Sequence, residues 1–474
     1  MGVIHIFCFL PLANGLVDYI EKRRTSFHTP GHKGGKALAK IFAEYSIGEL
    51  DLTELPDLDD LHHPTGIIAK AQRLCARCVG AQETFFLVNG ASVGVQAALL
   101  SSVGPGERIL IPRNSHKSVV SALILTGAKP IYYMPEIHAA FGLPLGTLVK
   151  NIAQKLQDFP DIKAVMALYP TYYGTTFELD ALRKVWDGIL IVDEAHGAHF
   201  PFSDSLPSSA VQIGADVVIQ STHKTLGALS QGAMLHLGEN SRVAPEQMRQ
   251  ALDVLHTTSP SYVIMASLEG AVWQAHQNRE HWDLLAAHSS RLKERLLSRG
   301  VKILSMADAG TFGIQEVDPT KFVVKVKEGR GPQIAAELAE RYGVQAELWN
   351  NDSILFILGM GDTLSSLREL EAALESIAGQ GYSDVALPSL PSIPQQVLTP
   401  REAYFSSKRV VKLEDSVGQV CGETLAPYPP GIPVVVPGEM ITREIVDYIR
   451  WSISGGAHWQ STTDPALKMI MVIE

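Results

Sequence analysis

Short apolar runs alternate with helix-spaced apolar positions over the first half of the chain. In a parallel sheet covered by helices on both sides, the strands are buried on both faces and form continuous apolar runs. The pattern predicts strands at residues 84–88, 108–112, 130–134, 164–169, 188–193, 217–220 and 232–237. It predicts helices at residues 67–79, 115–126, 147–157, 179–186, 242–252 and 261–277. We therefore expect an α/β fold with a largely parallel sheet.

The alternation restarts on a smaller scale after a helix predicted at residues 281–299. Strands at 301–304, 322–326, 344–348 and 354–358 alternate there with helices at 331–342 and 364–378, which predicts a second, smaller α/β unit. A proline-rich stretch at 387–398 predicts a linker. The expected parts of the chain are an N-terminal leader, helix and glycine-rich loop (1–50), a large domain (51–300), a small α/β domain (301–386), the linker (387–398) and a C-terminal domain (399–474).

Composition narrows the possible partners. The 474 residues are 46% hydrophobic and carry a formal net charge of −10, which argues against nucleic acid or an anionic membrane as partner. Four cysteines in so long a chain indicate a reducing compartment, so we expect a cytoplasmic protein. Cys75 and Cys78 have the spacing of a metal or redox pair, but no second pair follows and a helix is the favoured interpretation. We expect no metal site.

The first dozen residues are apolar, but this run is too short to cross a bilayer and lacks a positive leader. We do not expect a signal peptide. Whether residues 1–15 are the true start of the protein stays open.

Polar side chains follow the predicted strands at the edge where parallel sheets bind ligands. Asp193 ends one strand, and Lys224 follows 31 residues later (224 − 193), about the length of one strand–helix–strand crossover. The residues that fall just beyond strand ends are Ser92, His116, Thr171, Asp193 and Lys224. Their coincidence predicts one shared site.

The residue types at this edge favour a cofactor with an aldehyde, a pyridine ring and a phosphate. A desolvated lysine such as Lys224 has a lowered pKa and can attack an aldehyde. A buried carboxylate such as Asp193 can hold a pyridine nitrogen protonated. The glycine-rich turn at residues 89–94, before a predicted helix, can bind a phosphate. Together these groups describe pyridoxal 5'-phosphate (PLP).

Each residue alone also has a plainer interpretation. Lys224 suits a surface position after a strand, and Asp193 or His116 suits a helix start. His223 and His196 are candidates for proton transfer, because histidine titrates near neutral pH. A polar glycine-rich loop at residues 26–35 either is solvated or covers a site for an anionic group.

The motifs taken in order resemble the short form of the Orn/Lys/Arg decarboxylase family, which are fold type I PLP enzymes. The resemblance covers nearly the whole chain from about Leu16 onward. The residues that carry it are Phe27-His-Thr-Pro-Gly-His-Lys-Gly-Gly35, Leu87-Val-Asn-Gly-Ala-Ser92, Arg113-Asn-Ser-His-Lys-Ser118, Tyr169-Pro-Thr-Tyr172, Asp193-Glu-Ala-His196, Ser221-Thr-His-Lys224, Thr257-Thr-Ser-Pro-Ser-Tyr262, Tyr428-Pro-Pro-Gly-Ile-Pro433 and Pro437-Gly-Glu439.

The resemblance implies a role for each matching residue. Lys224 would form the internal aldimine, Asp193 would pair with the pyridine nitrogen, and His116 would stack on the ring. The expected cofactor-binding set is Ala91, Ser92, His116, Thr171, Asp193, Ser221, His223 and Lys224, with Thr257 or Ser259 reaching the phosphate from a neighbouring subunit. The expected catalytic set is Lys224, Asp193, His223 and His196. The chain would then be a homodimer or a larger homo-oligomer with a shared active site.

The implied reaction is decarboxylation of a basic L-amino acid to its amine, feeding polyamine synthesis. Arginine is favoured as substrate, then lysine, then ornithine. Glu423 and Glu439 are candidates to bind the substrate's distal cation, as are Asp51 and Glu54, although solvated surface explains such carboxylates equally well. His196 departs from the long forms of the family, which resemble Trp there, so its role stays open. Whether the chain forms the large ring assembly of the long forms also stays open, because no counterpart of their N-terminal wing domain is expected in this sequence.

Two alternative functions follow from the same residues. One is another fold type I PLP reaction, by an aminotransferase or a lyase. The other is a non-catalytic PLP-binding regulator, against which stands the absence of a basic DNA-binding segment.

Overall fold

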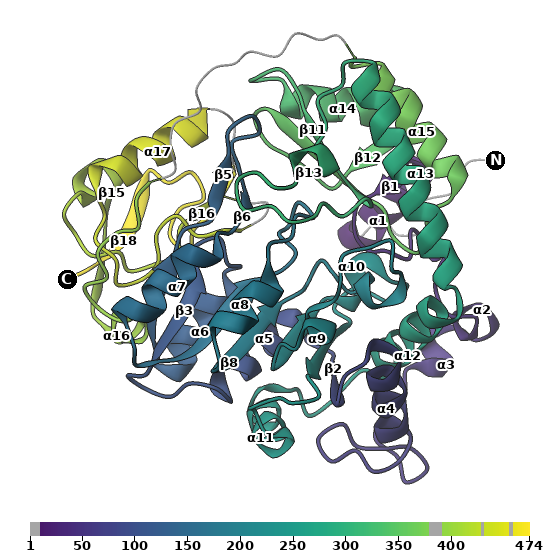
Figure 1. The fold of residues 1–474 in the computed structure, drawn as a ribbon, viewed down its shortest axis with the longest axis horizontal. Coiled ribbons are helices and arrows are strands. Elements are labelled where there is room, and N and C mark those ends of the chain that lie inside the picture. Colours follow the sequence, from purple (N-terminus) through teal and green to yellow (C-terminus); the bar gives the residue numbers. More distant parts are fainter. Residues whose placement is uncertain (1–9, 379–390, 428–430, 455–457) are drawn as a thin grey trace.

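A seven-stranded sheet forms the centre of the large domain in the computed structural model, which describes residues 10–378, 391–427, 431–454 and 458–474 (Figure 1). Along the sheet the strands are β2 (Glu83–Leu87), β10 (Ala233–Leu237), β9 (Val217–Gln220), β8 (Ile189–Asp193), β7 (Ile162–Leu168), β3 (Arg108–Pro112) and β4 (Lys129–Tyr133). β10 runs antiparallel to β2 and β9, and the other neighbours are parallel. The predicted, largely parallel α/β fold is confirmed.

Helices cover both faces of this sheet, because successive strand side chains point to opposite faces. Ile109 and Ile111 pack with α5 (Ala91–Leu100), α6 (Ser118–Thr126) and α11 (Pro245–Leu255). Leu110 belongs to the core on the opposite face. The helices that contribute to that core are α4 (Ile67–Val79), α7 (Val149–Asp158), α8 (Leu179–Val185), α9 (Ala210–Ile213), α12 (Tyr262–Gln277) and α13 (Arg279–Ser298). Cys75 and Cys78 are buried on α4 and pack in the same core.

Two helices of the large domain begin three residues later than the pattern predicts. α6 starts at Ser118, because the preceding residues form the loop that contains His116. α11 starts at Pro245, a residue type suited to a first helical turn. The backbone N–H of Arg242 donates instead to Asp216 Oδ1 at 2.7 Å. A hairpin of β5 (Glu136–His138) and β6 (Leu143–Gly146) was absent from the prediction.

The small domain has its own antiparallel sheet, formed by β11 (Lys321–Lys325), β14 (Ser353–Ile357) and β13 (Leu348–Trp349). α14 (Gly331–Arg341) and α15 (Leu364–Glu375) pack beside it, while β12 (Val344–Ala346) pairs with β1 (Thr25–Phe27) from the N-terminal segment. The strand predicted at 301–304 is reduced to a single bridge between Ile303 and Val324. One apolar cluster runs from the large sheet into this domain, so the two domains share a core.

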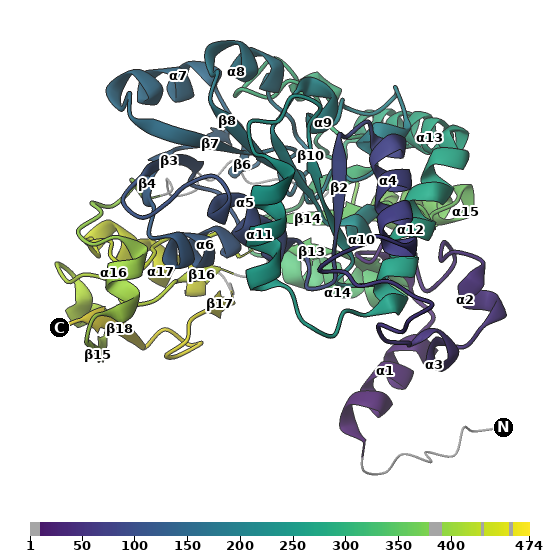
Figure 2. The ribbon, with the colours of Figure 1, turned by 90° about the horizontal axis from the view of Figure 1, so that it is seen from below.

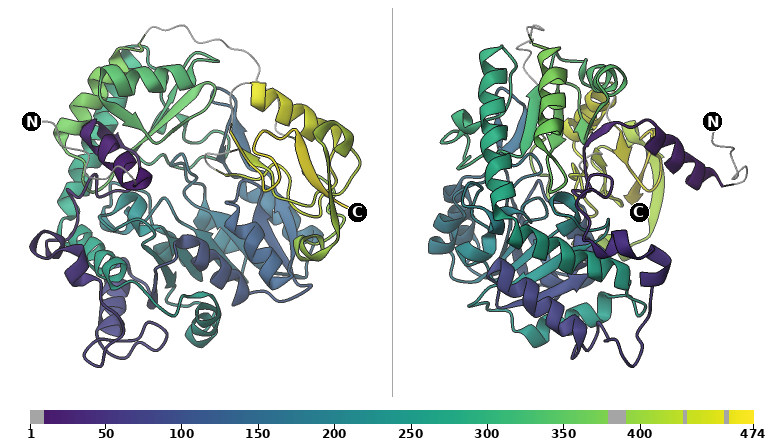
Figure 3. Two further views of the ribbon diagram at one scale, coloured as in Figure 1. Left: turned by 180° about the vertical axis from the view of Figure 1, so that it is seen from behind. Right: turned by 90° about the vertical axis from the view of Figure 1, so that its right-hand side faces the viewer.

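The N-terminal segment contains α1 (Pro11–Glu21), α2 (Ile41–Glu44) and α3 (Ile47–Leu50). The apolar spacing predicts a helix at residues 16–24. α1 starts earlier, at Pro11, because proline suits the first turn of a helix. The helix projects from the body of the molecule (Figures 2 and 3). Its apolar side chains are uncovered, with Leu12 77% and Ile20 70% exposed.

The C-terminal part, yellow in Figure 1, has a separate apolar core. It contains α16 (Pro400–Phe405), β15 (Lys408–Lys412), β16 (Ala426–Pro427), α17 (Arg443–Ser454), β17 (Trp459–Gln460) and β18 (Met469–Ile473). The beginning of the predicted linker, residues 387–390, lies outside the described residues, as do residues 1–9 of the predicted leader and 428–430 of the proline motif. Within the described ranges, no helix is long and apolar enough to cross a membrane.

Candidate active site

Lys224 lies on α10 (Thr222–Thr225), a single helical turn directly after β9. The backbone of this turn is fixed on the side of β10, because His223 N–H donates to the Gly232 carbonyl at 3.1 Å. The His223 imidazole contacts the same carbonyl through Nδ1 at 2.9 Å. Burial lowers the pKa of His223 to about 4. His223 is therefore neutral at neutral pH and braces the turn that carries Lys224.

The glycine-rich loop of the N-terminal segment packs against the other side of this turn. Gly31 N–H donates to the His223 carbonyl at 2.8 Å. A Cβ atom on Gly31 would lie 2.5 Å from the carbonyl carbon and oxygen of Thr225, so no larger residue fits there without movement. From the small domain, Met360 N–H donates to the Thr225 carbonyl at 2.8 Å. The loop at residues 26–35 therefore packs beside the Lys224 turn, which favours its interpretation as a cover for the site over that of a solvated loop.

Asp193 is the last residue of β8 and is buried, and Lys224 follows the neighbouring parallel strand β9 and is partly buried. The Asp193 carboxylate accepts a hydrogen bond from the Ala195 N–H at 3.1 Å. Burial raises the pKa of Asp193, and the positive charge of Lys224 opposes that shift. Burial lowers the pKa of Lys224, while Asp193 and Glu347 oppose the shift. A carboxylate and an amine with perturbed pKa values thus lie at one sheet edge, as active sites require.

His196 contacts Lys224 directly. Its Nε2 lies 2.8 Å from Lys224 Nζ, and its ring centre lies 4.4 Å from that of Tyr172. Lys224 Nζ also lies 5.8 Å from the centre of the Tyr172 ring. Burial, followed by the charges of Lys224 and Lys321, lowers the pKa of His196 well below its usual value. The imidazole beside the reactive lysine is therefore neutral.

His116 lies in the loop between β3 and α6, where its Nδ1 accepts a hydrogen bond from the Ser118 N–H at 3.2 Å and lies 2.9 Å from Ser118 Oγ. Burial and the nearby charge of Lys224 lower the pKa of His116 to about 4. Thr171 lies beyond β7, where its Oγ1 is 2.6 Å from Thr175 Oγ1. The strand-end residues predicted from the sequence therefore gather at one edge of the sheet.

The start of α5 provides an anion cradle. Gly90 has a φ of 79°, which favours glycine, and a Cβ built there would meet no atom within 4 Å. No side chain caps the first turn of α5, and Ser92 is exposed there, so the positive end of the helix dipole suits an anion. Ser221 precedes α10 and is buried. The hydroxyl of the neighbouring Thr222 is buried without a partner among the described residues.

Four of the predicted residues lie apart from Lys224: Thr257, Ser259, Glu423 and Glu439. Among the described residues, no hydrogen bond or ion pair joins them to Lys224, His196 or Asp193. Thr257 and Ser259 are 3.1 Å apart through their hydroxyls at an exposed position. Glu439 is fully buried and contacts Arg113 through both carboxylate oxygens at 2.6 and 2.8 Å. Glu423 accepts hydrogen bonds from Ser461, the Thr462 N–H and the Met471 N–H. Protein donors therefore occupy both carboxylates.

Three residues of the site were missed from the sequence: Tyr172, Glu347 and Lys321. Tyr172 Oη donates to Glu347 Oε1 at 2.6 Å, and Glu347 Oε2 accepts the Thr29 N–H at 2.9 Å. Lys321 Nζ lies 3.1 Å from His196 Nδ1. The position of Tyr172 after a predicted strand could have identified it. Nothing in the local sequence marks Glu347 or Lys321, because their burial depends on how the two domains pack.

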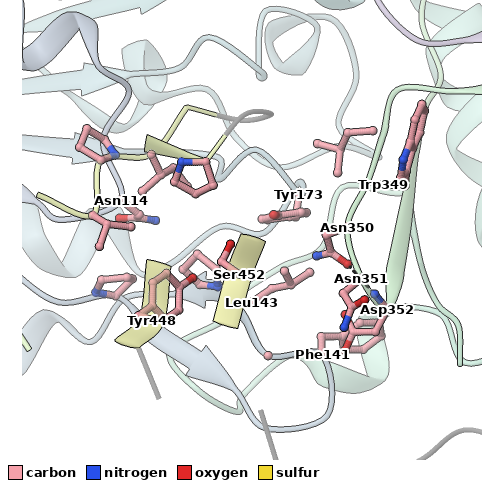
Figure 4. Close-up of a pocket in the computed structure, with 18 of the residues that line it drawn as sticks. Asn114, Phe141, Leu143, Tyr173, Trp349, Asn350, Asn351, Asp352, Tyr448 and Ser452 are labelled. Atoms are coloured by element: carbon pink, nitrogen blue, oxygen red, sulfur yellow. Dashed lines mark hydrogen bonds between the residues drawn. The ribbon is translucent and has the colours of Figure 1, made fainter. Parts of the chain in front are cut away.

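A cavity of about 330 Å³ adjoins this cluster between the large, small and C-terminal parts of the chain (Figure 4). Glu347 lines the cavity and accepts a hydrogen bond from Tyr172, whose ring lies beside Lys224. Tyr448 and Ser452 of α17 face it from one side, and Trp349 and Asp352 of the small domain face it from the other. Aromatic, aliphatic and proline side chains form most of the lining, together with polar and charged residues: Arg113, Asn114, Glu347, Asn350, Asn351, Asp352, Ser452 and His458.

The residues around Lys224 fit PLP in their donor chemistry. A lysine amine with lowered pKa, a buried carboxylate, a neutral imidazole and an open helix N-terminus lie at one sheet edge. These are the groups that an aldehyde, a pyridinium, a planar ring and a phosphate require. Fold and site together define a fold type I PLP enzyme.

Comparison with known proteins assigns the family. Residues 10–366 match the major domain of Orn/Lys/Arg decarboxylase, and residues 386–459 match its C-terminal domain. The arginine decarboxylase of Bacillus anthracis is 35% identical over 98% of this chain and 97% of that protein. The chain belongs to the Orn/Lys/Arg decarboxylase family, so it is a PLP-dependent decarboxylase of a basic amino acid.

More distant relatives share the fold. The constitutive lysine decarboxylase of Escherichia coli is 24% identical over 95% of this chain and 78% of that protein. A solved structure of this E. coli enzyme superimposes with a TM-score of 0.75 at 20% identity, covering 98% of this chain and 82% of that one. A solved L-threonine transaldolase from Pseudomonas fluorescens in its internal aldimine state gives a TM-score of 0.56 at 17% identity, covering 77% of this chain and 86% of that one.

The close packing of Gly31 yields a first test. Gly31→Ala should destabilise the Lys224 turn by about 1–3 kcal/mol, because overpacking forces the backbone to move. The measurement is the melting temperature together with the amount of PLP retained after dialysis. Gly48→Ala is the matched control, because a Cβ there meets nothing within 4 Å. Equal stability and PLP retention in the two variants would contradict the packing described for the loop.

Proposed function

We propose that the protein decarboxylates L-arginine, with lysine and then ornithine as poorer substrates, and so supplies an amine for polyamine synthesis. The support comes from relatives in three Bacillus-group organisms, each named arginine decarboxylase and 35% identical over 98% of this chain. The relatives named lysine decarboxylase are 24–26% identical. The free, buried Cys75, Cys78 and Cys421 suit a reducing compartment, which fits a cytoplasmic enzyme.

The cavity beside Glu347 is suited to the substrate's side chain. A guanidinium is planar, weakly hydrated and always charged, so it stacks on aromatic rings and pairs with carboxylates. The cavity offers Tyr173 and Trp349 as aromatic surfaces and Glu347 as a carboxylate at its border with Lys224. Asp352 also lines it, but its Oδ2 is paired with Lys325. Glu347 also accepts hydrogen bonds from Tyr172 and Thr29, but each carboxylate oxygen can accept a second one, and among the described residues no lysine or arginine is paired with it. We therefore assign Glu347 to the distal cation.

Several residues of the chain would take part in this reaction, each with a different role. When bound, PLP supplies an electron sink for the pair released as the bond between the substrate's Cα and its carboxylate breaks. Asp193 would keep the ring nitrogen protonated, and the first turn of α5 would hold the phosphate. Lys224 would attach the cofactor and return a proton to Cα after CO2 leaves. His196, 2.8 Å from Lys224 Nζ, is placed to exchange that proton.

We also propose that the enzyme is a homodimer or a larger homo-oligomer. The apolar side chains of α1 are exposed on a helix that projects from the body (Figure 2). Exposed apolar surface of this kind marks an interaction site. Ser259 is exposed and Thr257 is partly buried, and their hydroxyls contact each other. No described hydrogen bond joins either residue to Lys224 or His196, so both suit contact with a neighbouring subunit. A second copy of the chain satisfies both observations.

The substrate is tested by measuring CO2 release from arginine, lysine and ornithine side by side with the PLP-loaded enzyme. We expect kcat/KM to be highest for arginine. A higher kcat/KM for lysine or ornithine would overturn the choice of substrate, and a keto-acid product without CO2 would indicate an aminotransferase.

Replacing Glu347 tests the assignment of the distal cation. Glu347→Gln should raise KM for arginine about tenfold or more, because the negative charge that strengthens the hydrogen bond to the guanidinium is removed. Glu316→Gln is the control, because Glu316 is a partly buried small-domain carboxylate outside the cavity. A KM unchanged in Glu347→Gln would remove Glu347 from substrate binding.

The oligomer is tested by light scattering of the PLP-loaded enzyme. The wild type should have at least twice the mass of one chain, and the double variant Leu12→Asp/Ile20→Asp should shift toward the monomer. Val185→Asp, on the exposed surface of α8, should keep the wild-type mass. A monomeric wild type at micromolar concentration would contradict the shared active site.

A further inference from the structure

His196 lies between Lys321, which is buried, and Lys224, which is partly buried. Its Nε2 is 2.8 Å from Lys224 Nζ, and its Nδ1 is 3.1 Å from Lys321 Nζ. Lys224 comes from the large domain and Lys321 is the first residue of β11 in the small domain. Lys321 is 99% buried, so water does not solvate its amine. The two amines and the imidazole form a continuous hydrogen-bonded row.

Counting protons in this row restricts its charge. A neutral imidazole donates from one nitrogen and accepts at the other, whereas an ammonium only donates. Neutral His196 therefore accepts from one lysine and donates to the other, and the receiving amine must be neutral. A protonated His196 would donate to both amines and require both to be neutral. In either case at least one of Lys224 and Lys321 carries a neutral amine.

The surroundings of Lys321 favour sharing a proton with His196 over a fixed ion pair. The charged groups facing its amine are Asp318 and Glu347, which favour its charge, and Lys224 and Lys33, which oppose it. The Asp318 carboxylate is occupied by His199 at 3.0 Å and by Thr320 Oγ1 at 2.7 Å. Burial outweighs these carboxylates and lowers the pKa of Lys321 to about 8.

The Tyr172 ring packs against His196, and the other titratable groups that act on the pKa of His196 are cations or imidazoles. They are Lys224, Lys321, His223 and His116, and all of them lower its pKa in addition to burial. The imidazole therefore passes protons between the lysines without keeping one.

The stem of Lys321 is held in place by the large domain. Gly174 has a φ of 89°, and a Cβ added there would lie 2.4 Å from Lys321 Cγ and 2.8 Å from Lys321 Cβ. Only glycine leaves room for the lysine at this position, so the row exists only when the small domain packs against the large one.

We propose that Lys321 is a positioning residue of the reaction, which acts through His196 to set the protonation of the Lys224 amine. The inference rests on Lys224 being the amine that takes up PLP. Lys321 accepts a proton from Lys224 by way of His196 Nε2 and Nδ1 and returns it by the same atoms. The row keeps the Lys224 amine neutral and reactive near neutral pH, at the position where it meets the cofactor aldehyde.

The test measures how fast the apoprotein takes up PLP as a function of pH, followed by the rise of visible absorbance. Only a neutral amine attacks an aldehyde, so the midpoint of this profile reports the pKa of Lys224. In Lys321→Met the proton acceptor is lost, and the midpoint should rise by about one pH unit, a tenfold slower uptake at neutral pH. In Lys321→Arg a permanent cation forces His196 to donate to Lys224, so the midpoint should fall.

Lys293 provides the matched control. It is buried like Lys321, its pKa is also lowered to about 8, and it donates to the Asp318 carbonyl at 3.2 Å. Among the described residues it has no contact with His196. Lys293→Met should leave the midpoint of the PLP-uptake profile unchanged. An equal shift in Lys293→Met and Lys321→Met would overturn the proposal, because the effect would then not depend on the row.

A His196→Phe background separates action through the imidazole from a direct field between the lysines. In this background, Lys321→Met and Lys321→Arg should no longer shift the midpoint in opposite directions. Persistent opposite shifts would overturn the role of His196. If Lys321→Met does not fold, Lys321→Arg carries the test, and a midpoint equal to the wild type contradicts the proposal. A wild type without visible absorbance would refute the PLP assignment of Lys224 instead.

Discussion

A lysine amine buried beside a carboxylate, at the ends of two neighbouring strands, is the constraint on which the rest of this structure depends. Removing a charge from water is costly, so such an amine tends toward its neutral, nucleophilic form. Asp193 opposes this shift from the next strand, and the balance leaves Lys224 available to an aldehyde. The imidazoles around it are kept neutral by the same burial. The sheet therefore both gathers these groups and sets their charges.

Three parts of the chain keep this amine out of water. The large sheet places the Lys224 turn, the N-terminal loop packs on it at Gly31, and the small domain closes it through Met360 and Lys321. The C-terminal part completes the adjoining cavity and is anchored to the large domain by the ion pair of Arg113 and Glu439. The large and small domains share a core, and this contact is needed for function because it brings Lys321 to His196 and Lys224.

Much of this arrangement was predictable, because local patterns dictate it. The apolar runs identified all seven strands of the large sheet, and parallel connections bring Asp193 and Lys224 to one edge. The helix starts at Ser118 and Pro245 were misplaced, since capping and a loop decide them rather than periodicity. Lys321 and Glu347 could not be predicted, because their contacts cross between domains more than a hundred residues apart in sequence. The carboxylates of Glu423 and Glu439 resembled free acids in the sequence, but they have protein donors in the fold.

Reduction of the PLP-loaded enzyme with borohydride, followed by peptide mass mapping, tests the central claim most directly. The treatment fixes the cofactor to whichever amine holds it. Among the described residues, the buried lysines Lys33, Lys293, Lys321 and Lys325 are the competitors of Lys224. The account predicts one label per chain, on the peptide that contains Lys224. A label on Lys321 or another lysine, or no label at all, would contradict it.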